Sequence, residues 1–134
     1  MEMYDGRYRE LGLHEVACKC GCGVNFISME LADKFMIARR LFGEGITITS
    51  GFRCINHNRS VGSQDTSSHT KGLALDVRPA RDVNIIKFIR LGICLGSAFG
   101  RVLLPRQGIE TQAIQSWFYH VDVDTDKTSR IGWY

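Results

Sequence analysis

The stretch Ser67-Ser-His69-Thr-Lys-Gly72-Leu-Ala-Leu-Asp76 decides how this chain is interpreted. Its aspartate lies in an apolar segment, where an unpaired carboxylate would be costly to bury. Seven residues of straight strand would separate the backbones of His69 and Asp76 by roughly 23 Å. A bend is therefore needed if the two side chains are to share one partner, and Gly72 makes a bend easy. We predict a turn at Gly72 that brings His69 and Asp76 together.

A second segment, Trp117-Phe-Tyr-His120-Val-Asp122-Val, has the character of a strand. Alternate residues of a strand face the same side, so His120 and Asp122 are expected to point together. Zinc binds histidine nitrogen and carboxylate oxygen, and its catalytic sites use three protein ligands with the fourth position left for water. We predict one catalytic Zn²⁺ held by His69, Asp76 and His120. Water bound in this way has a pKa near 7, which is typical of a hydrolytic centre.

Composition fits one globular domain. The chain has 134 residues, of which 44% are hydrophobic and 23% charged, enough for one core with little room for a second. Its formal charge is +3, but lysine and arginine are scattered, so no nucleic-acid partner is expected. Residues 1–10 lack the basic and apolar regions of a secretory signal, and no apolar run approaches the ~20 residues of a membrane span. We expect no signal peptide, no membrane span and synthesis in the cytoplasm.

Hydrophobic periodicity predicts an α+β fold, a small antiparallel sheet with flanking helices. A helix is expected over 29–42, because apolar residues recur at helical spacing between an N-cap at Ser28 and a stop at Gly43. The other expected elements are a helix over 83–95, strands over 46–50, 73–77, 100–104 and 117–123, and polar loops over 56–68 and 106–116.

The five cysteines are an odd number, and three of them crowd into Cys18-Lys-Cys20-Gly-Cys22. In a chain without an export signal, crowded thiols more often mean free thiols or a metal site than a disulfide framework. Two interpretations stay open: a second metal site with Cys54 as fourth ligand, or free thiols packed near a turn. Cys94 is interpreted as a core residue of the second helix.

Together with Ser50-Gly-Phe-Arg53 and Asn56-His-Asn58, these segments resemble the zinc D-alanyl-D-alanine carboxypeptidase family, whose fold is shared with hedgehog signalling domains. The resemblance runs from about residue 11 to 122. It is strongest to the small branch of bacterial murein endopeptidases and phage lysis or virion proteins, which have an opening like that of residues 15–23. The resemblance implies zinc on His69, Asp76 and His120. It also implies that Arg53 holds a substrate carboxylate or the developing oxyanion, and Ser67 is a second candidate for substrate binding.

The resemblance further implies a single zinc peptidase domain over residues 1–134. Its substrate would be a peptide bond of the peptidoglycan stem or cross-link, cleaved as a D,D-carboxypeptidase or an endopeptidase. Cleavage between L-alanine and D-glutamate fits the same metal site. An enzyme of this kind acts on the cell wall after release, as an endolysin does, or as part of a virion, where other virion proteins are its partners.

One position departs from the family pattern. Several branches have a catalytic Glu or Asp three residues before the last zinc histidine, and this chain has Trp117 there. Asp122 is the best remaining candidate for the general base, although a carboxylate beside a zinc histidine can equally be a residue that orients the ligand. The missing acid keeps a rival hypothesis open: a non-catalytic, zinc-containing structural or binding module of the same fold, such as a virion component.

Overall fold

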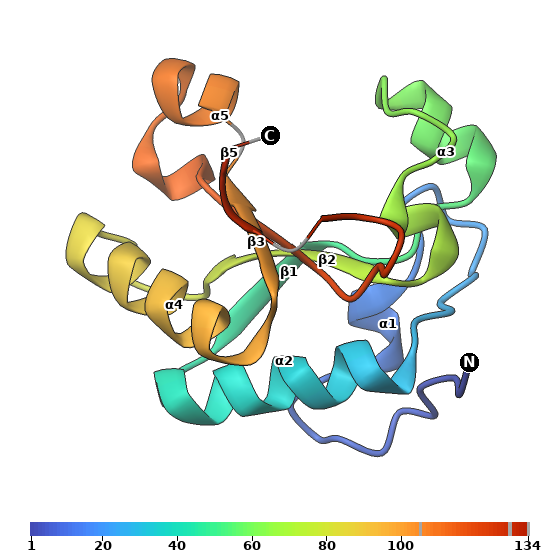
Figure 1. Ribbon diagram of the computed structural model, residues 1–134, viewed down its shortest axis with the longest axis horizontal. Coiled ribbons are helices and arrows are strands. Elements are labelled where there is room, and N and C mark those ends of the chain that lie inside the picture. Colours follow the sequence, from blue (N-terminus) through green and yellow to red (C-terminus); the bar gives the residue numbers. More distant parts are fainter. Residues whose placement is uncertain (105, 129, 134) are drawn as a thin grey trace.

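A five-stranded sheet forms the centre of the computed structural model (Figure 1), which describes residues 1–104, 106–128 and 130–133, with only the backbone for 106–108. All neighbouring strands are antiparallel except β3 and β5, which are parallel. The fold class is α+β, as predicted, and the sheet is mixed because of β5, a strand that was not predicted. The strands lie in the order β1 (Ile46–Ser50), β2 (Ala74–Pro79), β4 (Tyr119–Asp122), β3 (Arg101–Leu104) and β5 (Arg130–Trp133).

Two long helices, α2 (Met29–Phe42) and α4 (Ile85–Ala98), pack together below the sheet in Figure 1. The predicted bounds of α2 are confirmed. The hydroxyl of Ser28 accepts a hydrogen bond from the backbone N–H of Leu31 at 3.1 Å, and Gly43 ends the helix with φ of 75°. Helix α4 begins two residues later than predicted, because the side chain of Asn84 is its N-cap. Among the described residues, no helix is long and apolar enough to cross a bilayer.

The two segments predicted to be loops contain short helices. These were missed because one or two turns are too short to show an apolar period. In addition, the helix that begins at Ile55 has an unusual N-cap. The thiol of Cys54 accepts from the N–H of His57, in place of one of the usual capping side chains. The short helices of these two segments are α3 (Ile55–Ser60), α5 (Arg106–Thr111) and η2 (Ile114–Ser116). Two more lie elsewhere: η1 (Ser68–Lys71), which begins where the first segment ends, and α1 (Leu13–Val16).

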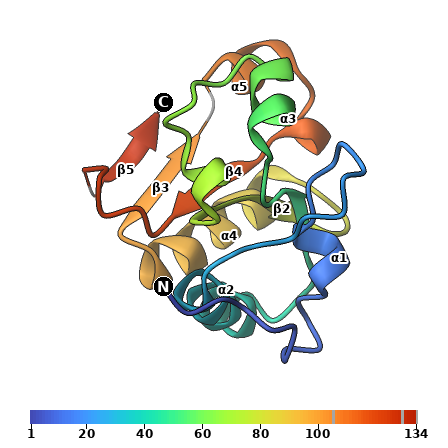
Figure 2. The same cartoon turned by 90° about the vertical axis from the view of Figure 1, so that its right-hand side faces the viewer.

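The central strands have one apolar and one polar face. Leu75 of β2 and Val121 of β4 belong to the hydrophobic core, and the hydroxyl of Tyr119 donates to the carbonyl of Phe88 in α4 at 2.8 Å. The residues that alternate with these point away from the two long helices. Figure 2 shows α3 and the turn that follows it on that other side of the sheet, so the polar face is covered by short, irregular elements.

Candidate metal centre

Three buried side chains from three elements converge on the polar face of the sheet. Nε2 of His69 lies 3.2 Å from Oδ1 of Asp76, and Nδ1 of His120 lies 3.1 Å from the same oxygen. The three potential ligand atoms all lie within 4.8 Å of one another. These are the residues that the sequence predicts as metal ligands, and the fold brings all three together.

The backbone explains how distant residues meet here. Asp76 and His120 are direct partners in the antiparallel pairing of β2 with β4. His69 reaches them because η1 ends at Gly72, which has the left-handed φ of 71°. A Cβ at this position would lie 2.5 Å from the carbonyl oxygen of Phe26, so only glycine fits. The predicted turn at Gly72 is confirmed.

Hydrogen bonds indicate which nitrogen of each histidine is available. Nδ1 of His69 lies 2.8 Å from the carbonyl oxygen of Gly51, which can only accept, so Nδ1 carries the proton and Nε2 presents its lone pair to the centre. Nε2 of His120 lies 2.7 Å from Oδ2 of Asp122, so in the neutral ring Nδ1 presents its lone pair. Two lone pairs and one carboxylate oxygen therefore face a common point.

This geometry fits a divalent ion. With bonds of 2.0–2.1 Å, the ligand atoms of a tetrahedral zinc lie about 3.3–3.4 Å apart, close to the 3.1 and 3.2 Å between the oxygen of Asp76 and the two histidine nitrogens. Burial by itself raises the pKa of Asp76, but His69 and His120 outweigh that effect and hold the pKa well below its usual range. The carboxylate is therefore ionised at neutral pH, as a metal ligand must be.

Burial also acts on His120, and by itself it lowers the pKa of the imidazole. The hydrogen bonds with Asp122 and Asp76 outweigh burial, so the pKa of His120 is raised. Protons therefore compete with a cation for Nδ1 more strongly than at an ordinary histidine, and binding is expected to depend on pH.

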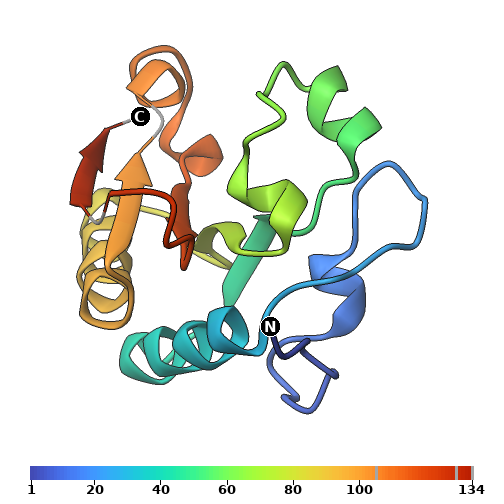
Figure 3. The same ribbon diagram turned by 45° about the vertical axis from the view of Figure 1, so that its right-hand side comes forward.

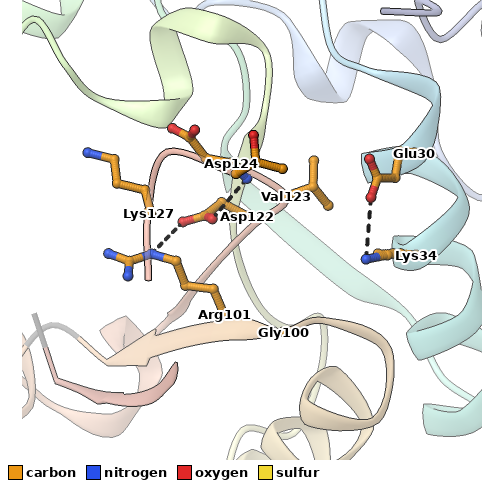
Figure 4. Close-up of a pocket in the computed structure, with 9 residues that line it drawn as sticks. Glu30, Lys34, Gly100, Arg101, Asp122, Val123, Asp124 and Lys127 are labelled. Carbon is orange, nitrogen blue, oxygen red and sulfur yellow. Dashed lines mark hydrogen bonds and ion pairs between the residues drawn. The ribbon is translucent and has the colours of Figure 1, made fainter. Parts of the chain in front are cut away.

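Among the described residues, Asp122 contacts the candidate centre through His120. Its Oδ2 accepts from Nε2 of His120 and from Nε of Arg101 at 2.9 Å, and its Oδ1 accepts from the backbone N–H of Asp124 at 3.2 Å. Figure 4 shows the pair of Arg101 and Asp122, which both line another pocket. Only 1% of the Asp122 side chain is exposed. Both oxygens are engaged, which favours an orienting role over that of a general base.

The three candidate ligand side chains line a pocket of about 330 Å³. Arg53 lies in its wall, and within the described part of the chain its buried Nε has no hydrogen-bond partner. Its backbone N–H donates to the carbonyl of His69 at 3.2 Å, which ties it to the centre. A buried donor without an acceptor is destabilising, so this guanidinium is suited to a ligand that brings oxygens of its own.

Ser67 lines the same pocket, and Trp117 lies just before β4, the strand that carries His120. The hydroxyl of Ser67 accepts from the backbone N–H of His69 at 3.3 Å, and the residue also lines a second pocket of about 190 Å³, which His120 lines as well. Nε1 of Trp117 donates to the carbonyl of Gln112, and its ring packs on Phe88. Among the described residues that line these two pockets, the carboxylates are those of Asp76 and Asp122 alone.

The five cysteines fall into two groups, as their positions in the sequence suggest. Cys94 is buried in α4, which confirms its interpretation as a core residue. The other four thiols gather at one place, apart from the histidine pair.

Sequence reasoning missed the role of Arg101, because its contact with Asp122 depends on the register of β3 against β4.

Comparison with known families gives one match. The model of the family described as Peptidase M15 matches residues 7–102, more than half of the chain. The matched range contains Arg53, His69 and Asp76, and His120 lies beyond its end. No curated protein matches the chain.

Proposed function

We propose a function from one premise: the chain belongs to the peptidase M15 family. In this proposal it hydrolyses peptide bonds with a single catalytic Zn²⁺ held by His69, Asp76 and His120. The observation that carries the proposal is the convergence of these three ligand atoms within 4.8 Å in the wall of a pocket. The separations of 3.1 and 3.2 Å support zinc, because they are close to those between neighbouring ligands of a tetrahedral ion.

The proposed substrate is a peptide of the peptidoglycan stem or cross-link, cleaved by D,D-carboxypeptidase or endopeptidase action. Two observations support it. The sequence resembles murein peptidases over the segments that form the site. Arg53, whose buried Nε has no partner among the described residues, lines a pocket beside the three candidate ligands, where a guanidinium can bind a peptide carboxylate or oxyanion. The same resemblance supports a phage lysis or virion-associated role, with action on the cell wall.

Each residue then has a separate task in hydrolysis. When bound, zinc polarises the scissile carbonyl and lowers the pKa of water. The carbonyl of Gly51 fixes the ring of His69 through Nδ1–H, at 2.8 Å. Asp122 accepts a hydrogen bond from Nε2–H of His120, which in the neutral ring leaves the lone pair of Nδ1 aimed at the centre. Arg53 supplies a rigid pair of donors to the substrate carboxylate or the developing oxyanion.

A second candidate function is a zinc-containing structural or binding module without turnover. One observation favours it: among the described residues that line the two pockets beside His120, every carboxylate is already engaged. Asp76 contacts both histidines, and both oxygens of Asp122 accept hydrogen bonds. Trp117 takes the position of the acid found in several branches, and its indole bonds to the backbone instead.

Digestion of purified murein sacculi separates the two functions. We would incubate sacculi with the wild-type protein, with His120→Ala and with His14→Ala, an exposed histidine that serves as the matched control. Each reaction would run with a chelator, without it, and after re-addition of zinc, with released peptides identified by mass spectrometry. Products that require His120 and zinc, but not His14, support the peptidase and identify its bond. Intact sacculi in every reaction, with zinc still bound, support the structural module.

A further inference from the structure

Four cysteine side chains meet at a second place in the molecule, away from the proposed catalytic centre. Sγ of Cys18 lies 3.4 Å from that of Cys20 and 3.8 Å from that of Cys54, and the sulfurs of Cys20 and Cys54 are 3.7 Å apart. With Cys22 included, the four sulfurs lie within 4.8 Å of one another. Two segments more than thirty residues apart thus contribute to one cluster.

These separations match one kind of site. In a tetrahedral zinc–thiolate centre with Zn–S bonds of about 2.3 Å, neighbouring sulfurs lie about 3.8 Å apart. The observed sulfur pairs at 3.4, 3.7 and 3.8 Å are near that value. A disulfide would instead require about 2.0 Å, and all five cysteines are free thiols.

The backbone holds the thiols in place from both segments. The loop that contains Cys18, Cys20 and Cys22 is closed by a hydrogen bond from the N–H of Cys18 to the carbonyl of Val24, at 2.8 Å. Gly21 has the left-handed φ of 87°, which lets the loop turn so that alternate residues gather on one side. Figure 3 shows this loop, in blue, beside α3, in green, whose first turn follows Cys54.

Backbone donors also point at two of the sulfurs. The N–H of Cys54 lies 3.4 Å from Sγ of Cys18, and the N–H of His57 lies 3.4 Å from Sγ of Cys54. Such donors stabilise the negative charge that a metal-bound thiolate carries.

We propose that Cys18, Cys20, Cys22 and Cys54 bind a second zinc ion, which is structural. Four sulfur ligands complete the tetrahedron and leave no position for water, so this ion has no part in hydrolysis. It joins the loop that carries three of its ligands to the start of α3. Because Cys54 directly follows Arg53, the ion also holds the backbone next to the arginine that the proposed catalytic pocket uses. The metal site itself does not depend on the proposed peptidase function.

Cobalt substitution tests the proposal on the whole chain. The protein would be purified under reducing conditions, stripped of metal and titrated with Co²⁺. Thiolate ligands give an intense charge-transfer absorption in the near ultraviolet, whereas the histidine and carboxylate ligands of the other centre do not. We expect this absorption in the wild-type protein and equally in His120→Ala, which leaves the thiols intact. We expect it to be lost in Cys22→Ser and in Cys54→Ser, while Cys94→Ala, the matched control in the core, retains it.

A second measurement covers variants that fail to fold. The reactivity of the wild-type thiols toward a disulfide reagent would be counted with zinc bound and again after chelation. Protection of four thiols by zinc supports the site, as does a zinc content that is one ion per chain lower in Cys22→Ser than in Cys94→Ala. A cobalt spectrum without the thiolate band, thiols that react equally with and without zinc, or disulfides among these cysteines in the reduced preparation would each overturn the proposal.

Discussion

Replacement of Asp122 by asparagine separates the two roles considered for this residue. The change keeps the shape of the side chain and removes the charge that Nε2 of His120 and Nε of Arg101 contact at 2.7 and 2.9 Å. Loss of a carboxylate that orients a zinc histidine typically weakens metal binding by about 10–100-fold, or about 1.4–2.8 kcal/mol. We expect a decrease of that size in the zinc affinity of Asp122→Asn.

The same substitution also removes the partner of Arg101. Breaking a buried charge pair costs about 3–5 kcal/mol. The cost should be lower here, about 2–3 kcal/mol, because Arg101 keeps contact with solvent and a hydrogen bond to the carbonyl of Thr128. We expect the metal-free variant to lose about this much unfolding free energy in urea titrations.

Competition with a chelating dye measures the zinc affinity, and murein digestion measures turnover. Asp126→Asn is the matched control, because its side chain is 80% exposed and its contact with Lys71 is a surface ion pair. The control should retain wild-type affinity, stability and turnover. An Asp122→Asn variant that binds zinc as tightly as wild type yet hydrolyses nothing would refute the orienting role and restore Asp122 as the general base.

Three further predictions concern the pocket, its pH dependence and its backbone. Arg53→Ala should keep its zinc content and lose about 10²–10³-fold in the rate of peptide release, because a donor to the oxyanion is removed. Zinc affinity, followed by dye competition, should fall as the pH is lowered, since the metal requires neutral His120. The raised pKa of His120 should start this loss above the ordinary histidine value of about 6.5. Gly72→Ala should destabilise the protein in urea titrations by more than the ~1–2 kcal/mol of a left-handed alanine, because its Cβ would meet the carbonyl of Phe26.

Controls make these three predictions specific. Arg81→Ala changes an exposed arginine outside the pocket and should leave turnover intact, so an equal loss in both arginine variants would contradict the role of Arg53. A zinc affinity that is constant between pH 5 and 8 would contradict the ligand role of His120. Gly43→Ala has the same sign of φ but open space around its Cβ. Equal destabilisation by Gly43→Ala and Gly72→Ala would show that the contact with Phe26 is unimportant.

The candidate metal ligands were accessible from the sequence because their chemistry is carried by residue type and order. His69, Gly72 and Asp76 imply a turn and a shared partner, and the alternation of His120 with Asp122 places both on one face of a strand. The bounds of α2 were accessible for a similar reason, since its caps, Ser28 and Gly43, are local signals.

Other features depend on tertiary register and could not be predicted. Arg101 reaches Asp122 only because β3 pairs with β4 at that position, and neither segment encodes the offset. Strand β5 is four residues long, largely exposed and contains Gly132, so its sequence carries only a weak strand signal. Helix α3 starts at a thiol cap that is absent from the usual set of capping residues.

An anomalous diffraction measurement at the zinc absorption edge, on crystals of the protein grown with zinc, tests the central claim most directly. We expect a peak about 2.0–2.2 Å from Nε2 of His69, Oδ1 of Asp76 and Nδ1 of His120, with the pocket of Arg53 open on its remaining side. Crystals in which the ion avoids these three atoms, with both histidines in place, would contradict the account of this site as a catalytic metal centre.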